Sequence, residues 1–346
     1  MKSAPRNDLN PLPYDEIVVL HDRAYDESTD DELFNITLAE EIGDIISTLG
    51  TSVTCLPYGD DTLNTLRKKK LAGTNFAVFN LVENVERKPE WQPRAMEALE
   101  ALHIPFTGTD AGTLLACDAD KFRMKEALLA QHLPTPAWAT RNYTKPLYEQ
   151  LGLWLVKSAI YHGSFNIHQD SVSDDPKHLL KLMQQYEDAH GGLWFAERYL
   201  EGREFYIAMI GRQGEDPELL PEAEIIYDRT FFKDGLRPLL TEAAKWDEDG
   251  AEFKATRTAF GELPDSDPLK AELTRLATAC WKALGLNGYA RVDFRIDENE
   301  KPHILEVNTN PYLGIHDSFI FQPAAKAGLS VADVLAKIIL CAHQPQ

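Results

Sequence analysis

The alternation of hydrophobic and polar residues is most regular near the C-terminus, between residues 289 and 308. Successive side chains of a β-strand point to opposite faces, so a half-buried strand repeats every second residue. Residues 289–296 follow this pattern, with one polar face formed by Tyr289, Arg291, Asp293 and Arg295. Residues 297–302 are polar and predict a turn. Residues 303–308 predict a second strand of an antiparallel hairpin, with one face formed by Ile304, Glu306 and Asn308.

The predicted hairpin brings polar groups from both strands onto one surface. If Ile296 pairs with His303, two carboxylates lie opposite each other, and a guanidinium lies opposite a carboxamide. The opposed pairs are then Asp293 with Glu306, and Arg291 with Asn308. Because directly opposed residues share a face of the sheet, all four groups are expected on one surface.

Two opposed carboxylates repel each other, and such a pair persists most readily when a cation lies between them. Mg²⁺ prefers hard oxygen ligands and usually keeps positions for substrate phosphates. Asp293, Glu306 and Asn308 therefore predict a Mg²⁺ site, with Mn²⁺ as a substitute. Arg291 could meet charge that develops on a reacting oxygen. The alternative is a solvated polar face with a cross-strand Arg–Glu pair, which is ordinary on antiparallel strands.

The first third of the chain alternates short apolar segments with helical patterns. Strands are predicted at 16–22, 52–58, 76–83 and 104–108, and helices at 33–49, 63–71 and 91–102. Strands that alternate with helices predict a small parallel sheet. Ligands of such sheets bind beyond the carboxyl ends of the strands. The polar residues predicted at that edge are Asp22, Asn80, Glu83 and Thr107.

A lysine in an apolar strand and a glycine–serine turn mark the middle of the chain. Lys157 lies in the apolar segment 153–158, where its ammonium either reaches the surface as an ordinary lysine or meets an anion. Six residues later, Gly163 and Ser164 offer backbone amides that could surround phosphate oxygens.

Elsewhere we predict helices at 120–131, 173–189, 267–284 and 329–341, a strand–turn–strand at 193–211, a strand at 222–227 and a lid-like irregular segment at 228–262.

Composition limits the class of protein. The 346 residues, 44% hydrophobic and 26% charged, predict a soluble chain of two or three domains. A net charge of −20 argues against nucleic-acid and anionic-membrane partners. No apolar segment is long enough for a membrane helix, and the N-terminus lacks a secretory signal. We therefore expect a cytoplasmic protein whose cysteines are reduced, namely Cys55, Cys117, Cys280 and Cys341.

Several motifs resemble the ATP-grasp superfamily, and most closely its D-alanine–D-alanine ligase branch. RVDFRID followed by LEVNTNP resembles the last motif of that branch, while FNLVEN and IPFTGTDAGTLLACDADKFRMKEALLAQHLPTP resemble its earlier part. The resemblance implies an α/β ATP-grasp fold, with an N-terminal parallel-sheet domain at 1–118 and two lobes clasping ATP at 119–203 and 204–346. It also implies that the magnesium ligands are Asp293, Glu306 and Asn308.

The resemblance further implies roles around ATP. Arg291, Lys245 and Ser164 would be catalytic, with Arg291 binding the acyl-phosphate or tetrahedral intermediate. Glu197 would face the adenine and Glu204 the ribose hydroxyls, since carboxylates accept hydrogen bonds from amines and hydroxyls. The alternative is that both glutamates are exposed hairpin charges. The other residues assigned to ATP are Lys121, Lys157, Arg198, Tyr199, Leu200 and Leu305.

The chain departs from the family around the expected substrates. HDRAYDESTDDE replaces the glycine-rich N-terminal loop, and Glu32, followed by Glu27, is the nearest match to the family's amine-binding glutamate. Phe165 replaces a serine, Trp246 a tyrosine and Tyr312 a glycine. We therefore predict that D-alanine is a poor substrate or none. The residues assigned to substrate are Glu32, Glu83, Trp246 and Tyr312.

Together these features predict an ATP- and Mg²⁺-dependent ligase that joins a small-molecule carboxylate to an amine, with amino acids as the expected substrates. A homodimer is the assembly to test. Two alternatives use the same nucleotide site. One is a phosphotransferase without the amine step, and the other is a nucleotide-binding protein without catalysis. The complete set of Arg291, Asp293, Glu306 and Asn308 counts against the second alternative.

Overall fold

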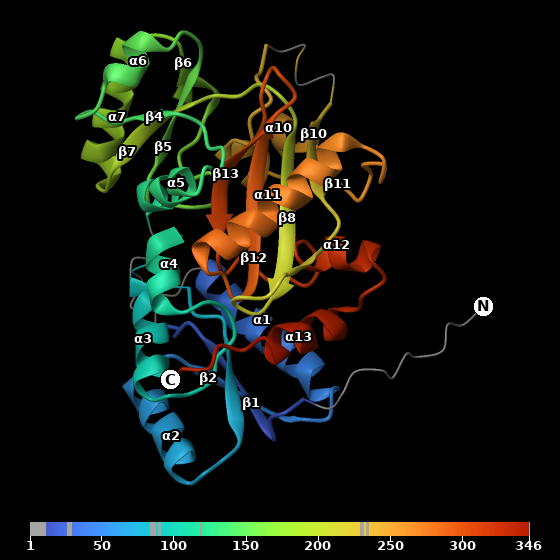
Figure 1. The fold of residues 1–346 in the computed structure, drawn as a ribbon. Coiled ribbons are helices and arrows are strands. Elements are labelled where there is room, and N and C mark those ends of the chain that lie inside the picture. The colour runs from blue at the N-terminus through green and yellow to red at the C-terminus, as the bar shows by residue number, and fades with distance from the viewer. Residues whose placement is uncertain are drawn as a thin grey trace.

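The computed structural model describes residues 12–25, 30–83, 88, 91–117, 120–228, 232 and 235–345, with the backbone alone at 30–32. These residues form three sheets, which Figure 1 shows with helices packed against them. One sheet lies in each of the predicted ranges 1–118, 119–203 and 204–346. The α/β arrangement expected from the sequence, an N-terminal parallel sheet followed by two further sheets, is therefore confirmed, while the domain boundaries themselves stay a prediction.

The N-terminal sheet is parallel, with the strand order β2-β1-β3. Its strands are β1 (Glu16–His21), β2 (Ser52–Pro57) and β3 (Phe76–Asn80), and its helices are α1 (Asp30–Ser47), α2 (Asp60–Leu71) and α3 (Pro93–Ala101). The predicted fourth strand at 104–108 is wrong. Phe106 forms only isolated bridges to Val78 and His343. Pro105 cannot donate to a ladder, and Gly108 turns the chain away with a φ of 93°.

The central sheet is antiparallel, with the order β4-β7-β5-β6. Helix α7 (Pro176–His190) covers it, with an apolar stripe that includes Leu179, Leu182 and Met183. Asp175 caps this helix by accepting a hydrogen bond from the Lys177 amide. The strands are β4 (Trp138–Ala139), β5 (Trp154–Ser158), β6 (Val172–Ser173) and β7 (Trp194–Arg198), and the shorter helices are α6 (Lys145–Glu149) and η2 (Gln169–Ser171).

The C-terminal sheet has the order β11-β10-β8-β12-β13, with β9 paired to β8. The strands are β8 (Glu204–Gly211), β9 (Glu218–Leu219), β10 (Ala223–Tyr227), β11 (Thr256–Phe260), β12 (Gly288–Ile296) and β13 (Pro302–Asn308). Helices α5 (Lys121–Ala130) and α11 (Pro268–Leu284) share one apolar core with this sheet. The remaining helices are α4 (Ala111–Cys117), α9 (Glu242–Trp246), α10 (Ala251–Lys254), α12 (Phe321–Lys326) and α13 (Val331–Leu340).

The hairpin of β12 and β13 contains a bulge that the periodicity did not predict. Ile296 pairs with Pro302, so the predicted pairing of Ile296 with His303 is wrong. The register shifts next to Asp293, and Leu305 is the extra residue opposite it. Beyond the bulge, the predicted pairs of Asp293 with Glu306 and Arg291 with Asn308 are both present.

The bulge also separates two residues that were expected on one face. Ile304 lies in the apolar core with Phe294 and Val307, whereas Glu306 lines a cavity on the opposite face. A slip of one residue exchanges the two faces of a strand, so the extra residue turns Glu306 away from the core. The prediction that Ile304 shares a face with Glu306 is therefore wrong.

The segment predicted as strand–turn–strand at 193–211 connects two different sheets. Strand β7 belongs to the central sheet and β8 to the C-terminal sheet, so the two strands do not form a hairpin. The C-terminal helix α13 returns to the N-terminal sheet, where Val334 and Ile338 share a core with Ile42 and Ile46 of α1. The chain end thus ties the N-terminal sheet to the C-terminal one (Figure 1).

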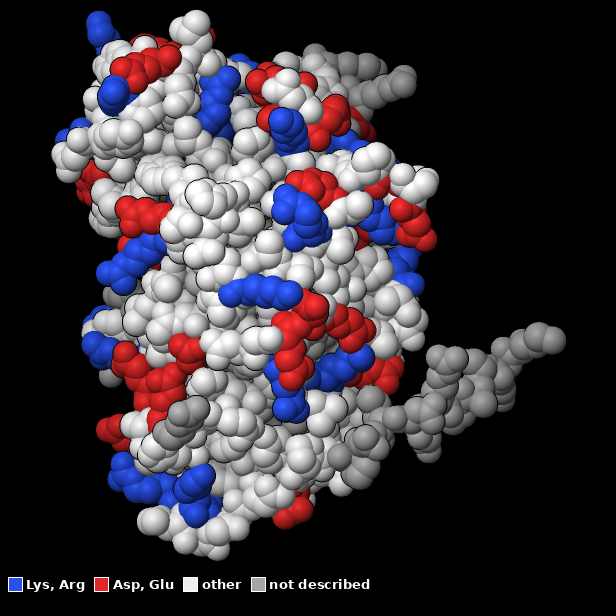
Figure 2. All heavy atoms as spheres, in the orientation of Figure 1, with Lys and Arg blue, Asp and Glu red and all other residues white. Residues whose placement is uncertain are grey.

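The visible surface mixes both signs of charge. Figure 2 shows lysine and arginine side chains lying among aspartate and glutamate rather than gathered into one continuous basic area. Within the part of the chain that the structure describes, no helix is long and apolar enough to span a membrane.

Candidate active site

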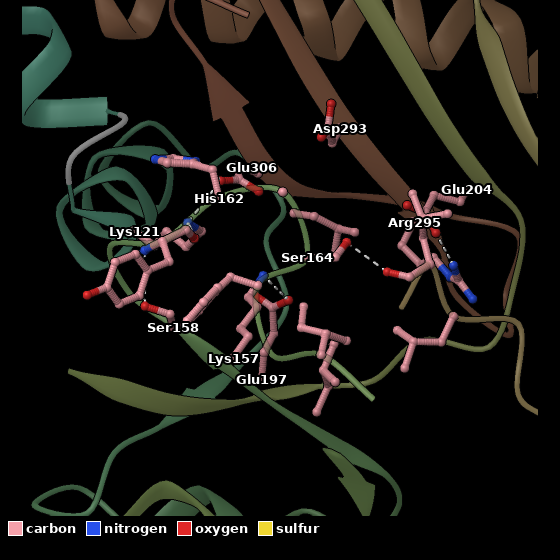
Figure 3. Close-up of a pocket in the computed structure, with 18 of the residues that line it drawn as sticks. Lys121, Lys157, Ser158, His162, Ser164, Glu197, Glu204, Asp293, Arg295 and Glu306 are labelled. Carbon is pink, nitrogen blue, oxygen red and sulfur yellow. Dashed lines mark hydrogen bonds and ion pairs between the residues drawn. The ribbon is translucent and has the colours of Figure 1, made fainter. Parts of the chain in front are cut away.

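One cavity lies between the central and C-terminal sheets, and it encloses about 920 Å³ including its open mouth. All the residues that the sequence assigned to catalysis, ATP and metal line it. Figure 3 shows them around the cavity, with Lys121 and Glu306 at one side and Glu204 and Arg295 at the other. The structure therefore brings these residues together, although their roles stay predictions.

The two opposed carboxylates each have a cation of their own. Arg291 donates two hydrogen bonds to Asp293, from Nε to Oδ1 at 2.6 Å and from Nη2 to Oδ2 at 2.8 Å. The Asn308 amide donates to Asp293 Oδ2 at 3.3 Å. Burial raises the pKa of Asp293, and Arg291 offsets only part of this rise. The predicted repulsion between Asp293 and Glu306 is thus relieved by side-chain cations in this structure.

Glu306 is held by a lysine and a histidine from other elements. Its Oε1 lies 3.0 Å from Lys121 Nζ and 3.0 Å from His162 Nδ1. Burial acts to raise the pKa of Glu306, but Lys121 and His162 outweigh it and hold the pKa well below its usual range. His162 had no predicted role, although it directly precedes the glycine–serine turn that the sequence singled out.

Glu197 is buried between two lysines. Its Oε2 lies 2.8 Å from Lys157 Nζ and its Oε1 lies 2.5 Å from Lys125 Nζ. Burial lowers the pKa of Lys125 to about 8 despite the neighbouring carboxylate. Both alternative interpretations are therefore wrong here, because Lys157 is no surface lysine and Glu197 is no exposed hairpin charge.

Sequence reasoning missed Lys125, although its spacing from Lys121 could have identified it. Residues four apart on a helix share a face, so both lysines project from the same side of α5. Lys121 reaches Glu306 of the C-terminal sheet, whereas Lys125 reaches Glu197 of the central sheet. One helix thus contacts the carboxylates of both sheets.

Arg295 organises the opposite end of the cavity. It donates from Nη1 to Glu204 and from Nε to the Leu200 carbonyl at 2.8 Å. The Tyr206 hydroxyl also donates to Glu204, at 2.7 Å. Glu204 is therefore buried and fixed, and it is not an exposed hairpin charge. The alternating pattern placed Arg295 on the polar face but assigned it no role.

The glycine–serine turn is joined to the predicted lid segment. Gly163 and Ser164 both have positive φ angles, 70° and 62°. Ser164 Oγ donates to the Leu240 carbonyl at 2.8 Å, and Trp246 Nε1 donates to the Gly163 carbonyl at 3.0 Å. The Trp246 side chain is 67% exposed and caps the turn from outside. Two residues of the predicted lid segment therefore bond directly to this turn.

Lys245 projects from the lid into the cavity. It makes no hydrogen bond or ion pair with another residue that the structure describes. Burial, followed by the nearby Arg291 guanidinium, lowers the pKa of Lys245. A partly buried lysine beside another cation suits an anionic ligand such as a phosphate.

Of the four residues assigned to substrate, the three with described side chains, Glu83, Trp246 and Tyr312, are not part of the lining of this cavity. The Glu32 and Glu27 side chains are outside the described residues, although Glu32 falls in the first turn of α1. Glu83 lines a second, smaller cavity. Tyr312 is 39% exposed, with its ring centroid 6.1 Å from that of Phe34. Their substrate roles stay predictions.

The family was tested by comparison with known proteins. The family model described as D-ala D-ala ligase C-terminus matches residues 137–340. A D-alanine–D-alanine ligase of Bordetella avium is 28% identical over 248 residues, which are 70% of this chain and 71% of that protein. The uncharacterized protein y4sG of Sinorhizobium fredii is 27% identical over 281 residues, which are 79% of this chain and 76% of that protein.

Solved structures share the fold at lower identity. The D-alanine–D-alanine ligase of Bacillus anthracis complexed with ATP has a TM-score of 0.70 and 20% identity, covering 94% of this chain and 96% of that chain. The VanG D-Ala:D-Ser ligase of Enterococcus faecalis has a TM-score of 0.70 and 16% identity, covering 95% of this chain and 99% of that chain. Because the family model spans more than half of the sequence, this protein belongs to the D-alanine–D-alanine ligase family of ATP-grasp, ATP-dependent ligases.

Proposed function

We propose that the protein is an ATP- and Mg²⁺-dependent ligase that joins an amino-acid carboxylate to an amine other than D-alanine. The observation that carries the proposal is the cavity between the central and C-terminal sheets. At one end Arg295 holds Glu204, which is suited to ribose, while the buried Glu197 beside Lys157 is suited to adenine. The other end gathers cations and carboxylates, suited to phosphates and a metal.

The oxygen donors fit Mg²⁺. Asp293 and Glu306 face each other in register, and the Asn308 carboxamide reaches an Asp293 oxygen. Carboxylate and carboxamide oxygens are hard ligands of the kind Mg²⁺ prefers. When bound, Mg²⁺ would neutralise phosphate charge and polarise the phosphoryl group. These three residues would hold it.

The reaction proposed for this site has two steps. A carboxylate oxygen of the acid attacks the γ-phosphorus of ATP, and the bond to the bridging oxygen breaks to give ADP and an acyl-phosphate. The amine nitrogen then attacks the acyl carbon, phosphate leaves, and one proton is released as the amide forms. The free energy of the phosphate bond is thereby used to form the amide.

This chain's residues would contribute charge and position to both steps. Lys121, Lys157 and Lys245 line the cavity from three different elements and would hold the phosphates. Arg291 would stabilise negative charge on the acyl oxygen. The predicted lid segment, whose Trp246 and Leu240 bond to the glycine–serine turn, would exclude water from the acyl-phosphate.

A product-release assay tests this proposal. ADP and phosphate are measured with panels of candidate acids, each with and without an amine. Release that requires both substrates, together with an amide product, supports the ligase. ADP with a phosphorylated acid and no use of the amine indicates a phosphotransferase. No ADP from any pair, despite ATP binding, indicates a nucleotide-binding protein without catalysis.

A further inference from the structure

Lys125 is a fully buried cation that does not line the main cavity. Its Nζ donates to Thr135 Oγ1 at 2.7 Å and to the Pro136 carbonyl at 3.4 Å, and it lies 5.6 Å from the centre of the Trp138 ring. A buried ammonium is costly unless a carboxylate pairs it, and Glu197 is that carboxylate. Any effect of Lys125 on a ligand in the cavity must therefore pass through its neighbours or its charge.

Glu197 connects Lys125 to a lysine that does line the cavity. Its Oε1 faces Lys125 at 2.5 Å, while its Oε2 faces Lys157 at 2.8 Å. Leu155 pairs with Glu197 across two antiparallel strands, so Lys157, two residues further on, lies on the same face of the central sheet as Glu197. Figure 3 shows the Lys157 ammonium directed at the Glu197 carboxylate. One carboxylate is therefore shared by two ammonium groups.

All three groups are charged near neutral pH. Burial acts to raise the pKa of Glu197, but Lys125 and Lys157 outweigh it and lower this pKa below its usual value. Burial acts to lower the pKa of Lys157, but Glu197 outweighs it and this pKa is raised. The pKa of Lys125, which burial lowers to about 8, leaves this lysine mostly protonated at pH 7. The three groups together thus carry one net positive charge.

Several other cations that line the cavity each face a carboxylate that balances their charge. These pairs are Arg291 with Asp293, Arg295 with Glu204 and Lys121 with Glu306. Glu197 would balance Lys157 in the same way if it had no second partner. Because Lys125 neutralises the same carboxylate, the Lys157 ammonium keeps an excess charge for an anion such as a phosphate.

We propose that Lys125 is a positioning residue for ATP, which acts through Glu197 to leave Lys157 with a net positive charge that attracts the phosphates. The inference rests on the proposed function only for the position of the phosphates beside Lys157. It predicts that loss of Lys125 weakens ligands according to their phosphate charge, although Lys125 touches none of them. A lysine with a purely structural role would weaken all ligands of the cavity alike, or none.

Adenosine, AMP and ADP test this inference, because they share base and ribose and differ in phosphate charge. Their Kd values are measured by calorimetry at pH 7 in EDTA, so that no metal ion neutralises the phosphates. The readout is the preference for ADP over adenosine within each variant, because this ratio does not depend on the fraction of binding-competent protein. Lys125→Met removes the charge and keeps a long, unbranched side chain. We expect it to lower the preference at least about tenfold, with AMP affected less than ADP.

Two further variants separate charge from structure. Thr135→Val is the matched control, because it removes the hydroxyl that accepts from Lys125 but changes no charge. Its preference for ADP should stay within about twofold of wild type. The double variant Lys125→Met plus Glu197→Gln also removes the carboxylate, so Lys157 regains a net positive charge. Its preference for ADP should return to within about threefold of wild type, whereas lost packing around Lys125 would not be repaired by a change at Glu197.

Each outcome supports or overturns the inference. A wild type that binds ADP no more tightly than adenosine overturns it, as does an unchanged preference in Lys125→Met. A double variant that stays as poor as Lys125→Met, or a Thr135→Val that falls as far, also overturns it. A charge-dependent loss in a protein that releases no ADP from any acid–amine pair supports the inference and refutes the proposed ligase function. Turnover that requires acid and amine, with an unchanged preference in Lys125→Met, keeps the ligase function and refutes the inference.

Discussion

Replacement of Glu306 by glutamine tests how charge is balanced in the main cavity. From the repulsion between opposed carboxylates alone, this change would relieve a like-charge pair and leave stability unchanged or raised. The structure predicts the opposite sign without metal. Glu306 accepts from Lys121 and His162, whereas Asp293 is already neutralised by Arg291. Removal of the Glu306 charge therefore removes the carboxylate nearest to a buried lysine.

The size of the stability loss in Glu306→Gln depends on how deeply the ion pair is buried and on which hydrogen bonds of Lys121 remain. Removing one partner of a buried ion pair costs about 3–5 kcal/mol. The Lys121 side chain is 4% exposed, but that of Glu306 is 21% exposed and retains some solvent screening. Glutamine keeps one carbonyl oxygen, and Lys121 still donates to the Tyr161 carbonyl at 2.9 Å. The expected loss is therefore smaller, about 1–3 kcal/mol.

Urea unfolding near pH 7 in EDTA measures this loss for wild type and Glu306→Gln. Glu298→Gln, an exposed change in the turn of the same hairpin, is the control and should be nearly neutral. With Mg-ATP, Glu306→Gln should also lose most of the ligand-induced stabilisation and most activity. If Glu306→Gln is as stable as wild type in EDTA, or more stable, the pairing of Glu306 with Lys121 contributes nothing and the reasoning is refuted.

Three further predictions use simple assays. Millimolar Mg-ATP should raise the wild-type melting temperature, since ligand at about 100 times its Kd adds about 2.7 kcal/mol, and an unchanged melt would contradict the nucleotide site. Burial lowers the pKa of Lys125 to about 8, so the unfolded chain binds more protons above that pH. The unfolding free energy of wild type minus that of Lys125→Met should therefore rise between about pH 8 and pH 10, by on the order of 1 kcal/mol per pH unit. Urea unfolding that gives the same difference at every pH in this range would contradict the prediction. Arg295→Lys should raise the KM for ATP roughly tenfold with little change in kcat, because lysine cannot hold Glu204 and the Leu200 carbonyl together; equal kinetics would show that Arg295 does not position them.

Local patterns in the sequence determined much of the fold. Strict alternation at 289–296 identified β12, and the helices predicted at 173–189 and 267–284 correspond to α7 and α11. Periodicity succeeds here because each element buries one face. Residues on one face recur at every second position in a strand and at every third or fourth position in a helix. The motifs around Asp293 and Glu306 also located the cavity wall, because these residues are close in the sequence and belong to one hairpin.

Only the tertiary structure decided how the charges pair. The bulge at Leu305 kept Asp293 opposite Glu306 although the turn end of the hairpin slipped by one residue. His162 meets Glu306 across 144 positions of the sequence, and α5 carries Lys125 to Glu197 in another sheet. Alternation specifies which face a side chain takes, but the strength of an ion pair depends on distance and burial in space. Those quantities are set by how the lobes pack, which no local pattern contains.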